Sequence, residues 1–195
     1  MNSEHRRDAA VAGHTGDEAT ARALLDHADP AVRATALGAL ARTGALRSSD
    51  VERALVDSDP GVRRRACEEA VSVTEVGLEP LLSDADRSVV EAAAWALGER
   101  GTDAAAAVDV LVGVARQHED ALCREAAVAA LGAIGDGRGL EAVLAAASGD
   151  RPAVRRRAVV ALAAFDGPEV DAALRAALSD RDWQVRQAAE DLLDG

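Results

Sequence analysis

The chain has 195 residues and a formal net charge of −12, and it contains 47 alanines and 22 arginines but no lysine. Only 2% of its residues are aromatic. Because strands favour aromatic and β-branched side chains while alanine heads the helix scale, an all-β fold is nearly excluded. The acidic balance also argues against a nucleic-acid partner, since phosphate contacts need a basic face.

The N-terminal residues, 1–16, are predicted to form a helical half-repeat that caps the rest of the chain. They carry charges from Glu4 onward and lack the apolar stretch of a signal peptide. The longest apolar run, residues 104–115, is broken by Asp109 and is too short to span a bilayer. We therefore expect a cytoplasmic protein that makes no use of a membrane.

From residue 29 onward, a five-residue pattern recurs six times. Its first two copies read Asp-Pro-Ala-Val-Arg and Asp-Pro-Gly-Val-Arg. The copies begin at Asp29, Asp59, Asp86, Asp120, Arg151 and Asp182, at intervals of 30, 27, 34, 31 and 31 residues. Such a period is typical of stacked supersecondary units.

Each copy is predicted to open a helix, because aspartate is a good N-cap and Pro30, Pro60 and Pro152 then occupy the first helical position. Counting the first residue of each copy as position 0, the apolar positions 3, 7 and 11 form one helical stripe, which ends at Leu193 in the last copy. Position 7 predicts a close approach between helices, because it is always alanine: Ala36, Ala66, Ala93, Ala127, Ala158 and Ala189.

A second amphipathic helix is expected before each of these helices, with similar endings at residues 23–26, 54–57, 80–83 and 177–180. Glycines follow three of the repeats, as a left-handed helix end prefers: Gly44, Gly101 and Gly135. A helix pair of this kind buries its apolar face only by stacking on its neighbours. We predict an all-α fold, an α-solenoid forming a single domain over residues 1–195, with its repeats from about 17 to 194.

The spacing, the Asp-Pro-x-Val-Arg opening and the segments 93–98 and 126–136 resemble HEAT repeats, most of all the short variety of the phycobilisome lyase HEAT-like group. The resemblance covers nearly the whole chain. It implies a right-handed α-solenoid of about six HEAT-like helix pairs whose second helices line the concave face. Because these repeats serve scaffolds, adaptors, regulators and a few enzymes, the resemblance indicates the fold more strongly than the function.

Position 4 is arginine in every copy except the third, where Val90 replaces it; the others are Arg33, Arg63, Arg124, Arg155 and Arg186. One interpretation is a basic track that is open to a ligand. We favour a structural role, since the resemblance implies that each arginine reaches the helix-start aspartate of a neighbouring repeat. The guanidinium fork suits such two-point pairing with a carboxylate.

Position 8 is apolar in five copies and becomes Glu190 in the last. An apolar row that turns acidic indicates that no further repeat covers it, so we expect the stack to end within this chain. We expect a monomer, although the apolar rows at the N-terminal end leave the oligomeric state open.

A candidate binding surface lies on the side of the second helices opposite the apolar stripe. Trp95 is predicted to point away from the core there, with Glu91 and Glu99 one turn away on either side. An exposed tryptophan is a good interaction anchor, although it can instead pack across an adjacent repeat. The seven candidate protein-binding residues are Trp95, Glu91, Glu99, Glu68, Arg64, Glu125 and Arg156.

Two arginine triplets, residues 63–65 and 155–157, interrupt the acidic surroundings. Position 4 takes one arginine of each triplet, which leaves two per triplet to pair with Glu68, Glu69 and Glu91 or with acidic groups of a partner. Two isolated triplets do not form the continuous basic surface that DNA requires.

We predict no catalytic residue, cofactor or metal site. The four histidines are scattered along the sequence, and Cys67 and Cys123 occupy packing positions. The pair His118-Glu119 is similar to the His-Glu pairs of deoxyhypusine hydroxylase, a HEAT-like di-iron enzyme. In that family the pair lies within the helix, and the equivalent positions here, Arg124-Glu125, Val90-Glu91 and Arg33-Ala34, carry no histidine, so the ligand set of that family is absent.

The sequence therefore favours a non-catalytic scaffold or adaptor that binds a protein or peptide partner on its concave face. The alternative is an accessory, chaperone-like or lyase-like protein for a chromophore-containing or other enzyme, and it rests on the resemblance alone. A repeat module without a selected ligand is a third possibility, against which the uneven repeat spacing argues.

Overall fold

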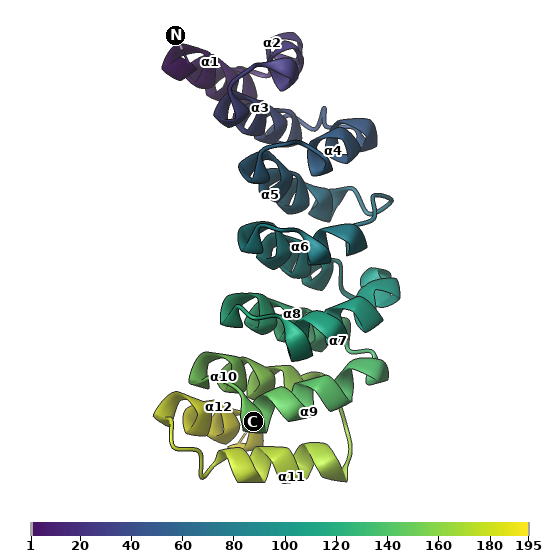
Figure 1. Cartoon of the computed structure of the whole chain (residues 1–195), viewed down its shortest axis with the longest axis vertical. Coiled ribbons are helices and arrows are strands. Elements are labelled where there is room, and N and C mark those ends of the chain that lie inside the picture. The colour runs from purple at the N-terminus through teal and green to yellow at the C-terminus, as the bar shows by residue number, and fades with distance from the viewer. Residues whose placement is uncertain (1, 195) are drawn as a thin grey trace. The chain divides into compact units, whose positions relative to one another are not determined.

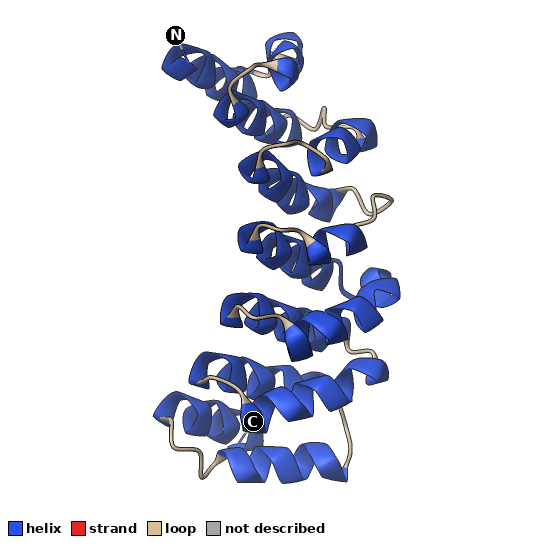
Figure 2. Cartoon of the chain, in the orientation of Figure 1, coloured by secondary structure: helices blue, strands red, loops and turns tan. Residues whose placement is uncertain are grey.

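The computed structural model describes residues 2–194, with the side chain of Asn2 left out. Every regular element in this range is helical, and the chain folds into two compact units that divide between Ala93 and Ala94 (Figure 2). The predicted all-α solenoid class is confirmed. Within residues 2–194, every helix is too short or too polar to span a bilayer.

Unit 1 places its helices in two rows. Figure 1 shows α1, α3 and α5 on one side, with α2 and α4 on the other. The elements of unit 1 are α1 (Asn2–Thr15), α2 (Glu18–Ala23), η1 (Leu24–Asp26), α3 (Pro30–Arg42), α4 (Ser48–Leu55), α5 (Pro60–Glu69), η2 (Ala70–Ser72), η3 (Glu79–Ser83) and the start of α6 (Arg87–Arg100).

Unit 2 repeats this arrangement, with the second helices α8, α10 and α12 on one side and the first helices α7, α9 and α11 on the other (Figure 1). Its elements are the rest of α6, η4 (Gly101–Ala107), α7 (Val108–Gln117), α8 (Ala121–Ile134), η5 (Gly137–Gly139), α9 (Leu140–Gly149), α10 (Pro152–Ala161), η6 (Leu162–Ala164), α11 (Pro168–Ala177) and α12 (Trp183–Asp194).

The predicted helix starts are confirmed at all six copies, and an aspartate caps the helix at five of them. The carboxylate of Asp29 accepts a hydrogen bond from the N–H of Ala31 at 2.9 Å, and Asp59, Asp86, Asp120 and Asp182 accept equivalent bonds. This bond satisfies a backbone donor that has no partner within the helix. Arg151 precedes α10 without a side-chain cap, and Pro152 takes the first helical position there.

The predicted apolar stripe forms the core. Every residue at position 7 is completely buried, and the residues at position 3 are at most 2% exposed. Leu193 is the exception to the stripe, because it lies in the last turn of α12 and is 43% exposed. No described helix follows α12 to cover it.

Two glycines lie at close backbone approaches between second helices of unit 2. A Cβ atom on Gly132 of α8 would lie 2.8 Å from Cα of Ala161 on α10, and one on Gly98 of α6 would lie 3.1 Å from Cα of Ala130 on α8. Both glycines occupy position 12 of their repeats, and both facing alanines occupy position 10. The sequence analysis did not predict this contact.

The first helix of the third repeat is reduced to the short η3, where the sequence predicted an amphipathic helix ending at residues 80–83. Gly77, Pro80 and the β-branched residues between 71 and 76 disfavour an α-helix in this stretch. The apolar side chains are buried nevertheless, with Val76 at 3% and Leu78 at 0% exposure. The shortest repeat interval, between Asp59 and Asp86, is therefore explained by the replacement of the first helix with η3, while the apolar core residues of that repeat are kept.

Candidate protein-binding face

Four of the position-4 arginines form two-point ion pairs between consecutive repeats, which we call the arginine ladder: Arg33 with Asp57, Arg63 with Asp84, Arg124 with Asp150, and Arg155 with Asp180. The donor–acceptor distances lie between 2.6 and 2.8 Å. Each pair lies within one unit. These arginines are therefore structural and are not a basic track for a ligand.

The partner of each ladder arginine differs from the one that the sequence predicted. It is not the helix-start residue but a carboxylate one or two residues before it, so Arg63 binds Asp84 and not Asp86. Asp84 Oδ1 also accepts the backbone N–H of Asp86 at 2.8 Å, while Asp86 caps α6. Where a turn has two aspartates, the first binds the ladder arginine and the second caps the following helix, so the helix-start carboxylate is already engaged with its own helix.

The ladder lowers the pKa of its carboxylates. Hydrogen bonds from Arg63, Arg124 and Arg155 favour the charged forms and hold the pKa values of Asp84, Asp150 and Asp180 below the ordinary range, although burial opposes the shift. The side chain of Arg155 is only 3% exposed and that of Asp180 is 13% exposed. This pair is therefore fixed in place and is not available to a partner.

Histidine occupies the ladder carboxylate's place in two repeats. Nδ1 of His27 accepts the N–H of Asp29 at 3.0 Å, and Nδ1 of His118 accepts the N–H of Asp120 at 3.1 Å. Because Nδ1 of His27 is an acceptor, its proton lies on Nε2, which donates to Nδ1 of His5 at 2.9 Å. Two histidines that are scattered in the sequence therefore meet, between α1 and the turn before α3.

In unit 1, the candidate residues Arg64 and Glu68 come together on α5, with Nε and Oε1 3.7 Å apart. Arg65 pairs with Glu68 at 3.1 Å and with Glu69 at 2.9 Å, so the first arginine triplet is largely neutralised by its own helix. Glu91 is exposed on α6 and forms none of these pairs. Arg64, Arg65, Glu68 and Glu69 thus form a self-paired surface, as the favoured interpretation of the triplet predicted.

In unit 2, Trp95 is 45% exposed on α6, so its side chain points away from the core, as its place in the repeat predicted. Glu99 is also exposed on that helix. Glu125 is half-buried on α8 and lies 3.6 Å from Nε of Arg157. Arg156 is half-buried on α10, and no hydrogen bond or ion pair engages it among residues 2–194.

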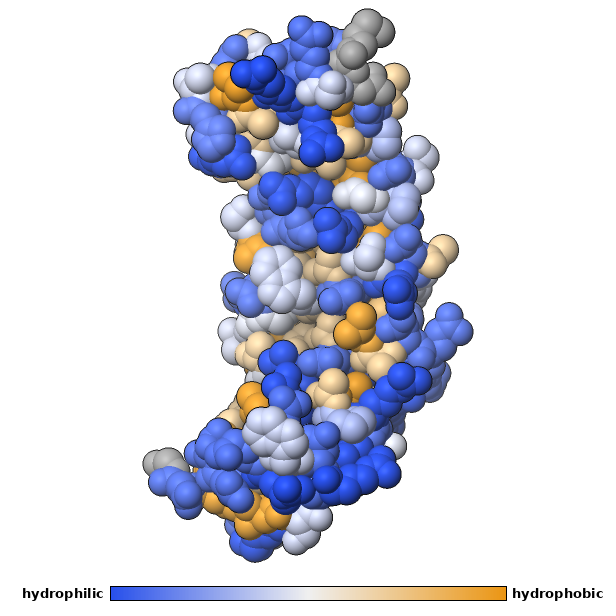
Figure 3. All heavy atoms as spheres, turned by 90° about the vertical axis from the view of Figure 1, so that its left-hand side faces the viewer, coloured by the Kyte–Doolittle hydropathy of each residue, from blue (hydrophilic) through white to orange (hydrophobic). Residues whose placement is uncertain are grey.

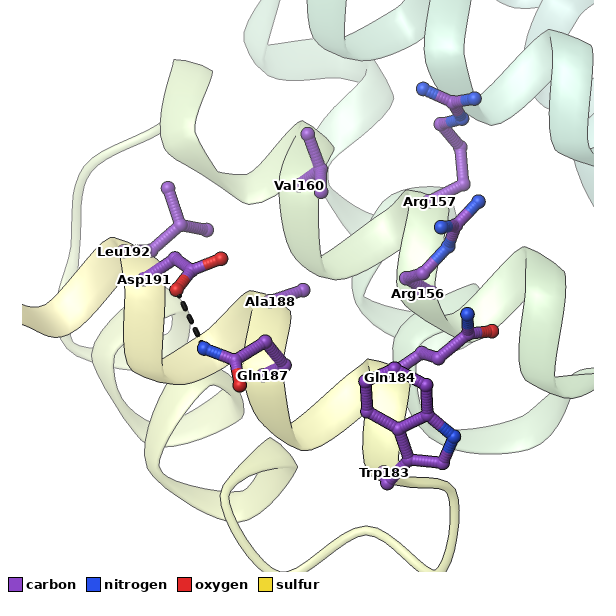
Figure 4. Close-up of a pocket in the computed structure, with 9 residues that line it drawn as sticks. All are labelled: Arg156, Arg157, Val160, Trp183, Gln184, Gln187, Ala188, Asp191 and Leu192. Carbon is purple, nitrogen blue, oxygen red and sulfur yellow. Dashed lines mark hydrogen bonds between the residues drawn. The ribbon is translucent and has the colours of Figure 1, made fainter.

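A groove lies between α10 and α12, with a volume of about 540 Å³. Figure 4 shows Arg156 and Arg157 extending from α10 above the indole of Trp183, which is the first residue of α12. Val160, Ala188 and Leu192 add apolar surface, and Asp191 accepts a hydrogen bond from the amide of Gln187 at 2.8 Å. Of the seven candidate residues, only Arg156 lines this groove.

Trp183 is missing from the candidates that the sequence provided, although it is 64% exposed. Trp183 occupies position 1 of the last copy, which lies outside the apolar stripe of positions 3, 7 and 11. The repeat pattern therefore already indicates that its side chain is exposed. Figure 3 looks onto the second helices, and apolar surface lies there among hydrophilic side chains in unit 2. The exposed apolar residues of these second helices include Trp95, Val160 and Trp183.

No group of three or more histidine, cysteine, aspartate or glutamate side chains in residues 2–194 is arranged to hold a metal ion. Cys67 and Cys123 are both buried in the core. The side chains exposed on the second helices are suited to contact with another molecule through apolar area and charge.

The paired helices, their repeated caps and the arginine ladder define an α-helical repeat protein. Models of the HEAT repeat family match residues 52–132, 75–148 and 108–194, so the chain belongs to the HEAT-repeat family. No curated protein sequence matches the chain.

Solved structures with the same fold include engineered and natural repeat proteins. An engineered protein aligns with a TM-score of 0.67 and 21% identity over 91% of this chain and 97% of its own. A chain from the complex of CpcE and CpcF of phycocyanin lyase from Nostoc sp. PCC7120 aligns with a TM-score of 0.63 and 25% identity, covering 90% and 75%. A designed armadillo repeat protein in complex with the peptide (KR)4 aligns with a TM-score of 0.54 and 18% identity, covering 98% and 90%.

Proposed function

We propose that this chain is a non-catalytic scaffold or adaptor that binds a protein or peptide partner on the exposed side of its second helices. The observation that carries the proposal is the exposure of Trp95, a large and rigid apolar side chain, on a helix whose opposite side is buried. Tryptophan is enriched among the residues that dominate binding energies. Rim charges such as Glu99 then contribute to partner choice.

The rigid repeat framework supports this role. Helices that are held by a buried core and a ladder of ion pairs present their exposed side chains without further ordering, which lowers the entropic cost of association. A HEAT-repeat fold is typical of protein-binding scaffolds, and one structure of similar fold is a designed protein in complex with a peptide.

The test is affinity capture from native lysate with quantitative mass spectrometry, using the wild-type chain and a Trp95→Ala, Glu99→Gln double variant. Both side chains are exposed, so the variant should fold normally. The matched control is Val110→Ala, since Val110 is 39% exposed on the first helix α7. We expect a specific partner that the double variant loses and the control retains. Equal capture by all three proteins would contradict the proposal.

A second candidate function is an accessory or lyase-like role for a chromophore-containing enzyme. The similarity to a chain of the phycocyanin lyase complex supports it, at 25% identity. Mixing the protein with a linear tetrapyrrole and recording the absorbance spectrum tests this role directly. A spectral shift that saturates at a fixed stoichiometry would favour it over the scaffold, and an unchanged spectrum would count against it.

A further inference from the structure

The groove between α10 and α12 combines cationic and apolar side chains in a chain whose net charge is −12. Its volume of about 540 Å³ falls within the range of ligand-binding clefts. The lining of α12 runs from Trp183 to Leu192, a rise of about 14 Å, which about four residues of an extended peptide would match.

The charge of Arg156 in this groove is not balanced by an ion pair among residues 2–194. Arg157 Nε is buried and makes no hydrogen bond, and the carboxylate oxygen of Glu125 lies 3.6 Å away. Asp191, the acidic residue of the lining, already accepts a hydrogen bond from Gln187. The donors of the groove that lack a hydrogen-bond partner among the described residues therefore include the Arg156 guanidinium and Arg157 Nε.

Other arginines of this chain do have carboxylate partners, as the arginine ladder shows. Arg155, the neighbour of Arg156 in the same triplet, makes a two-point ion pair with Asp180 and donates to the carbonyl of Asp150. In the first triplet, on α5, Arg64 and Arg65 pair with Glu68 and Glu69 of the same helix. The second triplet differs because α10 carries no acidic residue.

The apolar surface lies at a defined distance from this charge. Val160 is 46% exposed one helical turn after Arg156, a rise of about 6 Å, and Ala188 and Leu192 line the same groove from α12. In an extended peptide, side chains two residues apart point to the same side and lie about 6.6 Å apart. An acidic side chain and a bulky apolar side chain that are separated by one residue therefore fit Arg156 and Val160 together.

We propose that the α10–α12 groove binds an extended acidic peptide segment of a partner protein, with a carboxylate on Arg156 and Arg157 and a bulky apolar side chain, two residues away, against Val160 and Leu192. The indole of Trp183 covers the segment from the α12 side. This inference rests on the proposed scaffold function, and it names the partner's chemistry and the place where it docks.

The experiment is selection from a random short-peptide display library on the immobilised full-length protein. Parallel selections use Arg156→Gln and Trp183→Ala. The control is Arg175→Gln, which removes an exposed arginine from the first helix α11 outside the groove. Thermal unfolding followed by circular dichroism checks that all variants fold, which we expect because Arg156 has no partner among residues 2–194 and Trp183 is 64% exposed.

We expect the wild type and the Arg175→Gln control to enrich peptides with an acidic residue and a bulky apolar residue two positions apart. Synthetic peptides of that consensus should bind Arg156→Gln and Trp183→Ala at least about tenfold more weakly, since both changes remove anchors of the kind that dominate binding. Binding should also weaken as the salt concentration rises.

Three outcomes would overturn the inference: enrichment of basic or uncharged peptides, acidic peptides that bind the two groove variants normally, and no enrichment on the wild type. The scaffold function has a separate readout, which is capture of a protein that depends on Trp95. If acidic peptides are not enriched but a protein is still captured through Trp95, only the peptide-binding role of the groove is rejected. Loss of both rejects the scaffold function as well.

Discussion

Arg155 on α10 and Asp180, which follows α11, form a two-point ion pair with Nε–Oδ2 and Nη2–Oδ1 distances of 2.8 and 2.7 Å. Nη1 of Arg155 donates to the carbonyl of Asp150 at 2.7 Å, and Asp180 Oδ1 also accepts the N–H of Asp182. One arginine thus joins the turns of two consecutive repeats. Because little of either side chain reaches water, the pair is held in one geometry.

Replacing Arg155 by alanine should lower the free energy of unfolding by about 3 kcal/mol, because Asp180 would keep a largely buried charge without its cation. The matched control is Arg186→Ala. Arg186 occupies the same repeat position, and it donates to the carbonyl of Asp180 without a carboxylate partner, so a loss of about 1 kcal/mol is expected. Urea denaturation measures both values. Equal losses would show that the ion pair adds nothing.

Stability should fall in acid. Hydrogen bonds from the ladder arginines lower the pKa values of Asp84, Asp150 and Asp180 in the folded state, whereas an aspartate in the unfolded chain has a pKa of about 3.9. The unfolded state therefore takes up protons first, so the contribution is complete above about pH 4 and is lost as the pH falls through the folded pKa values.

Asp180→Asn tests this linkage. The variant should be less stable than the wild type at neutral pH, and its stability should decline less steeply between neutral pH and the acid transition, because one linked carboxyl group is gone. Chemical denaturation over a pH series provides the comparison. Parallel pH profiles for the two proteins would refute the assignment of Asp180.

Gly132→Ala should destabilise the protein by about 2 kcal/mol, because its Cβ would lie 2.6 Å from Cβ and 2.8 Å from Cα of Ala161. Gly113→Ala is the control. Gly113 lies inside α7 with nothing within 4 Å of its Cβ position, and alanine there should stabilise the helix by up to about 1 kcal/mol. Thermal unfolding distinguishes these opposite signs, and a neutral Gly132→Ala variant would contradict the close approach of α8 and α10.

Tryptophan fluorescence should show that both indoles are accessible to water in the folded protein. The chain has two tryptophans and no tyrosine, and Trp95 and Trp183 are 45% and 64% exposed. Acrylamide should quench both in the folded state, and the emission maximum should shift little on unfolding. Trp95→Phe and Trp183→Phe each leave a single reporter. A strongly blue-shifted folded emission from either variant would contradict the exposure of its remaining tryptophan.

Much of the candidate surface followed from the repeat alone, because a helical register places a residue on a face without reference to distant chain segments. The register correctly predicts that Trp95 is exposed, and the same reasoning applied to position 1 would have predicted the exposure of Trp183. The groove could not be found in this way. It depends on how α10 and α12 pack, and on the absence of acidic residues from α10, which leaves Arg156 without an ion-pair partner on its own helix.

The all-α class, the helix starts and the buried stripe could be predicted from the sequence, since capping and helical periodicity are local properties that recur with each repeat. The packing of the helices sets which carboxylate each ladder arginine binds, and it brings Gly132 against Ala161. It also brings His5 to His27. These contacts join residues at least 21 positions apart, so they depend on the packing of separate helices, which no local pattern encodes.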